Sequence, residues 1–301
     1  MTFPFTDLPI ELALDIITIA ARPDSTPSND LTCTRPLHTT ALTLASVSRS
    51  MYRYTMPHLL HTVACCKTDQ LKLFIRSFHD QRCRLPGSAL ALDYPKLVRR
   101  FWATGIWESL VNNDNDIDYR ALYDIIRGVD CLGISFHSLH LIYNALECAH
   151  RDPTASRWDC HRLILCGSHW RWSPLSSTAE GVAFLKHITH LALWVPYHDG
   201  TGVAKRTKIT PCWATGIPFS LMPSLCQFSF PLLSSGSYNG MMVYSGTREL
   251  CMEWMSTGQF GGETKQIMFQ RTSALAGENS SIWDFDYMQE EIERCQKLCD
   301  R

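Results

Sequence analysis

The stretch His161–Val195 is decisive for the fold, because it holds one complete strand–helix–strand unit. It reads HRLILCG at 161–167, STAEGVAFLKHI at 177–188 and THLALWV at 189–195. The first and third segments are short apolar runs of the length of a buried strand, and the segment between them has a helical pattern. A strand, a helix and a second strand in succession are typical of parallel strands joined by helical crossovers. The stretch therefore predicts an α/β fold.

The same alternation continues outward from this stretch. Further helical patterns lie at 68–81, 118–128, 138–150 and 247–256, between other short apolar runs. The candidate strands are HTVACC at 61, SALALDY at 88, VDCLGIS at 129, HRLILCG at 161, THLALWV at 189, LCQFSFP at 225 and KQIMFQ at 265. This order predicts mainly parallel strands that pair in the order of the chain.

The spacing of the candidate strands favours one α/β architecture over another. Their starts are 27 to 41 residues apart, and irregular periods near 30 indicate an irregular leucine-rich-repeat-like α/β solenoid. ITHLALWVPY at 188–197 and MPSLCQFSFPL at 222–232 resemble its Leu-x-x-Leu-x-Leu line. The alternative is a closed or doubly wound α/β sheet, which tolerates less variation in unit length. The segment 280–296 predicts a C-terminal capping helix that covers the last unit.

The first helix, expected from about Pro9 to Ala21, is apolar over most of its surface. One stripe holds Ile10, Leu14, Ile17 and Ala21, and a second holds Leu12, Ala13, Ile16, Ile19 and Ala20. Burying one Ile or Leu stabilises a fold by roughly 1.5–3 kcal/mol. Three or four left exposed would forfeit about 5–10 kcal/mol, which is comparable to the stability of a whole domain. We therefore expect the second stripe to be covered, either by the rest of this chain or by another protein.

Three motifs follow one another near the N-terminus: LPIELALDII at 8–17, LTLASVSRSMYRY at 42–54 and MPHLLHTV at 56–63. In this order they resemble an F-box of the divergent kind found in mushroom-forming fungi. The loop before the second motif is longer than in the common pattern, Ser48 stands where Cys is usual, and Leu60 replaces the closing aromatic residue. The resemblance covers about the first sixty residues.

An F-box implies that the second apolar stripe docks on the Skp adaptor of a cullin–RING ubiquitin ligase. The adaptor-binding residues that the resemblance implies are Leu8, Pro9, Leu12, Ile16, Ile19, Leu42, Leu44, Val47, Pro57 and Leu59. It also implies two domains, an F-box-like helical domain at 1–60 and the irregular leucine-rich-repeat-like α/β domain at 61–301. The expected function is that of a non-catalytic substrate receptor in the ubiquitin conjugation pathway, with an unknown target protein held by the solenoid. The alternative is a repeat-type protein-binding scaffold with no ubiquitin-ligase link.

Composition argues against several other partners. The formal net charge of the 301 residues is −1, so no general electrostatic field attracts nucleic acid or an anionic membrane. No stretch approaches the ~18 apolar residues of a membrane span, and the N-terminus lacks the pattern of a secretory signal. The thirteen scattered cysteines then predict reduced thiols in an intracellular protein, cytoplasmic or nuclear.

Catalytic and metal motifs are weak in this sequence. It contains no Gly-x-Ser-x-Gly, no phosphate-binding loop and no His-Glu-x-x-His. The most metal-like stretch holds Cys160, His161, Cys166 and His169, but it spans a candidate strand, whose neighbouring side chains point to opposite faces. Zinc sites commonly place ligands on tight turns such as Cys-x-x-Cys, which the sequence lacks. We therefore expect no enzymatic activity, no metal and no cofactor.

Overall fold

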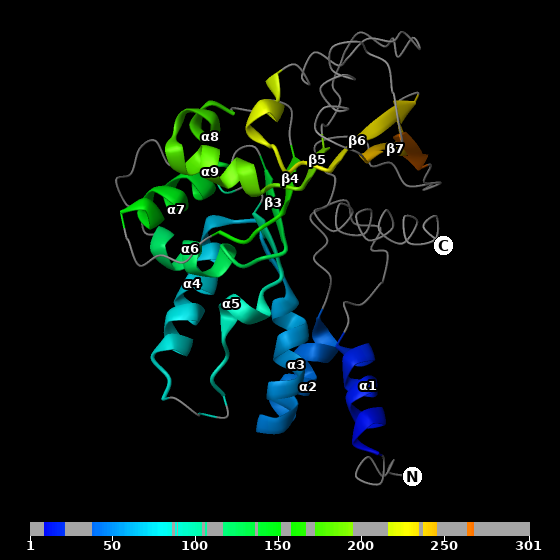
Figure 1. The fold of residues 1–301 in the computed structure, drawn as a ribbon. Helices are drawn as coiled ribbons and strands as arrows, with labels where there is room; N and C mark the ends of the chain where they lie inside the picture. The colour runs from blue at the N-terminus through cyan, green and yellow to red at the C-terminus, as the bar shows by residue number, and fades with distance from the viewer. Residues whose placement is uncertain are drawn as a thin grey trace.

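The N-terminal part of the chain folds into three helices at one end of the molecule, and an α/β body forms the rest (Figure 1). The helices are α1 (Ile10–Ala20), α2 (Thr39–Val47) and α3 (Arg49–His61). The computed structural model describes residues 9–21, 38–85, 88, 90–103, 106, 117–135, 138–151, 158–166, 172–194, 216–234, 237–245 and 264–267.

The strands of the body form one mixed sheet, and each pairs with the next strand in the chain. From the first to the sixth strand the pairing is parallel. Leu163 pairs with Leu191, and Leu191 pairs with Phe228, so the prediction of parallel neighbours in sequential order is confirmed. The strands are β1 (Thr62–Cys65), β2 (Arg100–Ala103), β3 (Cys131–Ser135), β4 (Arg162–Cys166), β5 (His190–Trp194), β6 (Gln227–Ser234), β7 (Ser237–Ser245) and β8 (Thr264–Ile267).

The alternation of side chains along these strands divides the sheet into two faces. One row across the parallel strands consists of large apolar residues that join the main hydrophobic core: Val63, Phe101, Leu132, Leu163, Leu191 and Phe228. The next row along the strands points to the opposite face and holds mostly small residues, beside one tryptophan and one isoleucine: Ala64, Trp102, Gly133, Ile164, Ala192 and Ser229. The core therefore lies on the first face.

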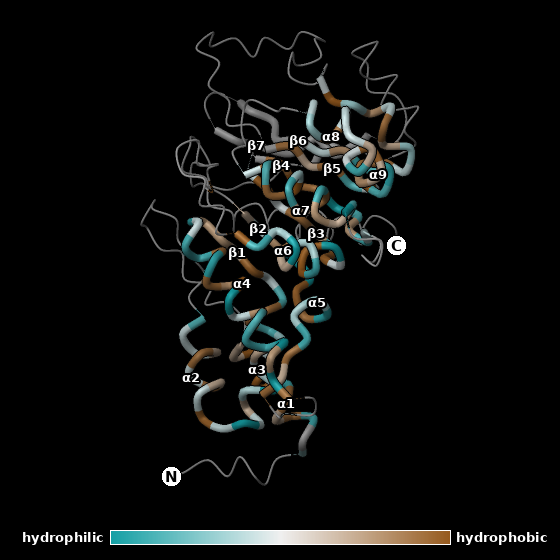
Figure 2. The backbone as a smooth tube through the Cα atoms, turned by 90° about the vertical axis from the view of Figure 1, so that its left-hand side faces the viewer, coloured by the Kyte–Doolittle hydropathy of each residue, from teal (hydrophilic) through white to brown (hydrophobic). Residues whose placement is uncertain are grey.

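The longer helices of the body stack on that first face in chain order (Figures 1 and 2). Their apolar stripes complete the core, with Leu71, Leu122 and Leu185 among the buried residues. Side-chain caps fix two of the helix starts: Asp118 accepts from the amide of Ala121 at 2.9 Å, and Thr178 from the amide of Gly181 at 3.1 Å. The helices are α4 (Thr68–Arg82), α5 (Tyr94–Leu97), α6 (Tyr119–Ile126), α7 (His140–His150), α8 (Ser173–Ser177) and α9 (Ala179–His187), with a 3-10 turn η4 (Phe219–Leu221).

Three strand predictions need correction. The segment SALALDY at 88 is not a strand; its described residues form a turn in which the amide of Ala91 donates to the carbonyl of Ser88. The second strand is instead β2, which begins at Arg100. The third correction concerns β7, which is not among the strands predicted from the sequence. This strand pairs antiparallel with both β6 and β8, so the chain reverses direction after β6. The helix expected at 247–256 and the capping helix expected at 280–296 lie outside the described residues.

The region after α1 also differs from expectation. The sequence 39–56 has a helical pattern that predicts one helix ending at Pro57, but the structure has two helices there. Ser48 adopts an extended conformation between them, and its side chain caps α3 by accepting from the amide of Met51 at 3.1 Å. Pro57 does not end a helix but lies inside α3, where it removes one backbone hydrogen bond. The last residue of α3 is His61 and β1 begins at Thr62, so these two elements are continuous.

None of the described helices is long and apolar enough to cross a membrane.

Candidate protein-docking surface

Helix α1 exposes three large apolar side chains. Leu12, Ile16 and Ile19 lie four and three residues apart, the spacing that places side chains along one side of a helix. Their exposed fractions are 51%, 43% and 65%. Exposed apolar residues are common singly, but a row of them on one helix side marks an interaction site.

The other side of α1 is occupied within the chain. Ile17 and Ala21 are buried and Leu14 is half-buried, which is the first stripe that the sequence pattern predicts. This side packs on α3, where Thr18 Oγ1 lies 3.4 Å from Nε2 of His58. The contact with α3 therefore leaves the row of Leu12, Ile16 and Ile19 uncovered.

Helix α2 adds two more exposed apolar side chains. Leu42 and Val47 are exposed to 60% and 66%, whereas Ala41 is buried. Helices α1, α2 and α3 lie together at the same end of the molecule in both views (Figures 1 and 2). Leu42 and Val47 are five residues apart, so they point to different sides of α2. We call the exposed apolar side chains of these two helices, Leu12, Ile16, Ile19, Leu42 and Val47, the N-terminal apolar surface.

The structure places the other predicted adaptor-binding residues differently. Pro9 is exposed just before α1, and Leu8 lies outside the described residues. Leu44, Pro57 and Leu59 are half-buried and offer less area to a partner. Eight of the predicted residues thus lie on α1, α2 and α3, where five on α1 and α2 are exposed and three are partly covered by the chain itself.

Sequence reasoning missed one exposed aromatic residue in this region. The motif at 42–54 contains two tyrosines, of which Tyr52 matches the aromatic position of the F-box pattern and is half-buried, while Tyr54 on α3 is 45% exposed. The signal that would find Tyr54 is its position two residues after Tyr52, because a two-residue step turns a helix by about 200° and so reaches its opposite side. Glu11 and Asp15 are exposed beside the apolar row of α1 and give its border a negative charge.

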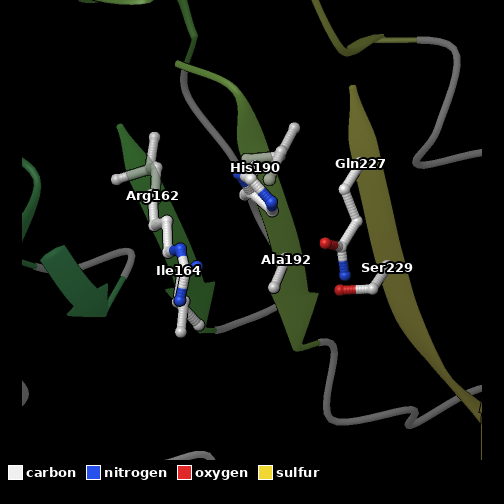
Figure 3. A pocket seen from close by; sticks show the side chains of 8 residues that line it. Arg162, Ile164, His190, Ala192, Gln227 and Ser229 are labelled. Atoms are coloured by element: carbon white, nitrogen blue, oxygen red, sulfur yellow. The ribbon is translucent and has the colours of Figure 1, made fainter. Parts of the chain in front are cut away.

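The sheet face opposite the helices holds a second candidate, shown in Figure 3. Arg162, His190, Gln227 and Ser229 line a cavity of about 10 Å³ across three neighbouring strands. That volume accommodates at most one water molecule. The cavity is therefore too small for a ligand.

Two residues of the metal-like stretch, Cys160 and His161, differ in exposure, and His169 lies outside the described residues. Cys160 is buried, and its Sγ donates to the carbonyl of Arg162 at 3.4 Å, whereas His161 is exposed. Burial raises the pKa of the Cys160 thiol well above its ordinary value, which opposes the thiolate that a metal would need. Within the described part of the chain, no group of three or more His, Cys, Asp or Glu residues is placed to hold a metal ion.

Comparisons of the chain with protein-family models, with curated proteins and with solved structures find no match.

Proposed function

We propose that this protein is a non-catalytic substrate receptor of a Skp–cullin–F-box ubiquitin ligase. The observation that carries the proposal is the N-terminal apolar surface: the side of α1 that the F-box pattern assigns to the adaptor is the side that the fold leaves exposed. The Skp adaptor would bind there, and a target protein would bind to the α/β body.

The energetics of this surface favour a partner. Its five side chains are each exposed by roughly half. Covering the exposed half of five such chains is worth on the order of 5 kcal/mol. Association itself costs several kcal/mol in lost translational and rotational freedom, and burial of this surface offsets part of that cost. A protein of matching apolar shape is therefore a suitable occupant.

The α/β body is consistent with the leucine-rich-repeat-like solenoid that we propose for it. Its parallel strands start at residues 62, 100, 131, 162, 190 and 227, so the units are 28 to 38 residues long. Each strand lies beside the preceding one, and from β1 to β5 the chain passes through a helix of the helical layer between strands, as in repeat units. The antiparallel pairs formed by β7 and β8 depart from the repeat pattern and follow its last unit.

In this proposal the chain contributes proximity rather than chemistry. The ligase partners would carry the ubiquitin-transfer machinery, and the receptor would hold a target lysine within reach of it. Holding two reactants together makes a bimolecular step effectively unimolecular, which is a large part of many rate enhancements.

The test is adaptor binding by two matched variants. Ile16→Glu places a charge in the N-terminal apolar surface, and a desolvated, unpaired charge costs several kcal/mol, so we expect at least a hundredfold weaker adaptor binding. Leu73→Glu introduces the same charge at a 63% exposed leucine on α4 and should bind like the wild type. Both should be co-expressed with the adaptor, and affinity and thermal stability measured for each.

The repeat-type scaffold with no ligase link remains the second candidate, and one observation favours it. Leu60 of α3 belongs to the core of the α/β body, and Met56 packs against that core, so the N-terminal helices are partly integrated with the body. Wild-type protein that fails to bind the adaptor, with a strong loss of melting temperature in Ile16→Glu, would replace the receptor proposal by this one.

A further inference from the structure

A surface groove lies on the helix side of the body, between the end of α4, the segment 91–95 and the end of α6. Its volume is about 480 Å³, which is within the range of small-ligand sites. The lining residues are Phe78, Gln81, Arg82, Ala91, Leu92, Asp93, Tyr94, Pro95, Asp124 and Arg127. It is separate from the N-terminal apolar surface and does not depend on the proposed function.

Hydrogen bonds hold the walls of this groove in place. The buried side chain of Gln81 accepts from the amide of Leu92 at 3.0 Å, which fixes the 91–95 segment to α4. The Tyr94 hydroxyl lies 2.6 Å from Oγ of Ser77, and the rings of Tyr94 and Phe78 are 6.1 Å apart between centroids. The groove is thus preformed, with two nearly buried aromatic rings in its wall.

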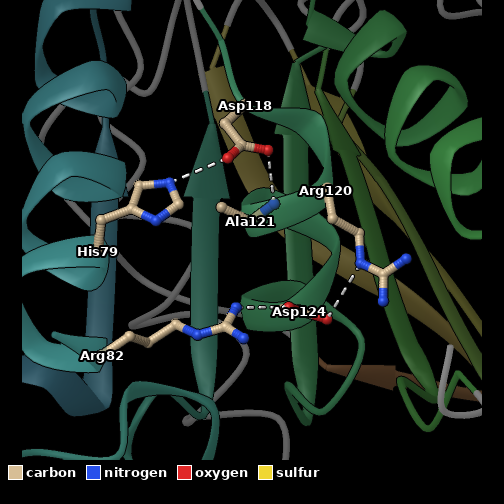
Figure 4. Close-up of polar contacts among 6 residues, drawn as sticks. All are labelled: His79, Arg82, Asp118, Arg120, Ala121 and Asp124. Carbon is tan, nitrogen blue, oxygen red and sulfur yellow. Dashed lines mark hydrogen bonds and ion pairs between the residues drawn. The ribbon is translucent and has the colours of Figure 1, made fainter. Parts of the chain in front are cut away.

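All but one of the charged groups in the groove wall are paired with each other or with a neighbour. Arg82 donates to Asp124 at 3.1 Å, and Asp124 also lies 3.8 Å from Nε of Arg120 (Figure 4). Asp93 is paired with Lys96 at 2.7 Å. Both carboxylates in the groove wall, Asp93 and Asp124, are therefore paired with cationic side chains.

Arg127 is the exception. It follows directly after α6 and forms no ion pair with any residue that the structure describes. Its Nε atom is buried and finds no hydrogen-bond acceptor in the described part of the chain. Because this Nε atom is itself covered, a ligand in the groove would reach Arg127 through the terminal nitrogens of its guanidinium, whose charge is not paired within the described part of the chain.

We propose that this groove binds a single carboxylate carried on an apolar body, with Arg127 as its ion-pair partner. The fork of a guanidinium matches a carboxylate in two parallel hydrogen bonds. The aromatic residues Phe78 and Tyr94 and the ring of Pro95 contact the apolar part. A phosphate is a poorer ligand, because Arg127 is the one cation of the described wall that is not already paired and so balances only one of its two negative charges.

The first test compares three probes on the full-length wild-type protein by calorimetric titration at pH 7. The probes are 3-phenylpropionate, its uncharged amide and phenyl phosphate, which share an aromatic ring and differ in the head group. We expect saturable binding of the carboxylate, and binding at least tenfold weaker for the amide and for the phosphate. No saturable binding of the carboxylate, or equal binding of the amide, overturns the proposal, and so does tighter binding of the phosphate.

The second test assigns the site to Arg127. Arg127→Gln should weaken 3-phenylpropionate binding at least tenfold, and Arg127→Lys should recover only part of it, because an ammonium group lacks the planar fork. Arg99→Gln is the matched control, since Arg99 is an exposed arginine outside the groove that lies 3.7 Å from Asp130. Unchanged binding in Arg127→Gln overturns the proposal. If the Arg127 variants do not fold, the wild-type comparison of the carboxylate with its amide decides it.

Discussion

Trp102 on β2 lies directly against Gly133, its partner in register on β3. A Cβ atom at position 133 would come within 1.9 Å of Cε3 of the Trp102 indole, and Trp102 is fully buried. The absence of a side chain at Gly133 is therefore what gives the indole its place on the sheet face opposite the helices.

Gly133→Ala should destabilise the protein markedly. The indole cannot move aside because it is fully buried, so the added methyl group forces strain of the kind that costs about 1–3 kcal/mol or more. Thermal unfolding of the variant measures the loss. Gly216→Ala is the control, because a Cβ there meets no described atom within 4 Å. A wild-type melting temperature for Gly133→Ala would contradict this packing.

Gly181→Ala changes stability through two opposing effects, a gain in helix propensity and a steric clash. Alanine is favoured over glycine by about 0.8–1.0 kcal/mol inside a helix, so propensity alone predicts a more stable α9. A Cβ at this position would lie 2.4 Å from the carbonyl oxygen of Leu175 and 2.7 Å from Oγ1 of Thr178, which caps the helix. Because the nearer atom belongs to the backbone, we expect packing to prevail and the melting temperature to fall. A rise would show that α8 shifts easily relative to α9.

Truncation of the neighbours Ile16 and Ile17 to Ala should change the free energy of unfolding by very different amounts. Ile17 is 5% exposed, and truncating such a residue to Ala costs about 2–5 kcal/mol. Ile16→Ala should change the free energy of unfolding by no more than about 0.5 kcal/mol, as for most surface sites. Denaturant unfolding of both variants measures this difference. Similar losses would indicate that both sides of α1 are covered in the isolated protein.

The reactivity of the cysteines should follow their burial. Cys160 is buried and burial raises the pKa of its thiol, whereas Cys83 is exposed. Alkylation of the native protein at pH 8 should therefore modify Cys83 and spare Cys160. Under denaturing conditions without reductant, mass measurement should find all thirteen cysteines modified. Pairs that resist alkylation in denaturant would contradict reduced thiols.

Cys160 should also make the stability of the folded protein fall as the pH rises in the alkaline range. Because the pKa of its thiol is raised in the folded state, the folded protein keeps a proton that the unfolded chain releases above about pH 8.5. The stabilisation is complete below that pH and is lost as the pH rises toward the folded pKa. The melting temperature should fall more steeply between pH 8.5 and 10.5 in the wild type than in Cys160→Ala. Parallel curves would refute this linkage.

The sequence predicted those parts of the fold that depend on local periodicity. The apolar runs around Leu163, Leu191 and Phe228 alternate with helical patterns, and neighbouring parallel strands follow from that order. Strand β2 was missed because Arg99 and Arg100 suggest a solvated cluster, although the next residues are buried. SALALDY has the composition of a strand, but its described residues include a turn at Leu90, and the amide of Leu92 bonds to Gln81 of α4 instead of to a strand.

The two stripes of α1 were predictable and the groove at Arg127 was not. A helix has one period, so the sequence alone separates Ile17 and Ala21 from Leu12, Ile16 and Ile19, and the observed burial follows that division. The groove joins Gln81, Tyr94 and Arg127, which are brought together only by the packing of α4 and α6. No local pattern marks a residue whose role depends on such a tertiary contact.

Because α3 runs directly into β1, a change in the angle between these two elements would tilt the sheet relative to the N-terminal helices. Neighbouring strands are about 4.8 Å apart, so β6 lies roughly 24 Å across the sheet from β1. A tilt of about 10° at the junction of His61 and Thr62 would then displace β6 by about 4 Å. Leu60 and Met56 of α3 also pack against the core of the body and so oppose such a tilt, and a partner bound to α1 and α2 would therefore present the far strands at a nearly fixed angle.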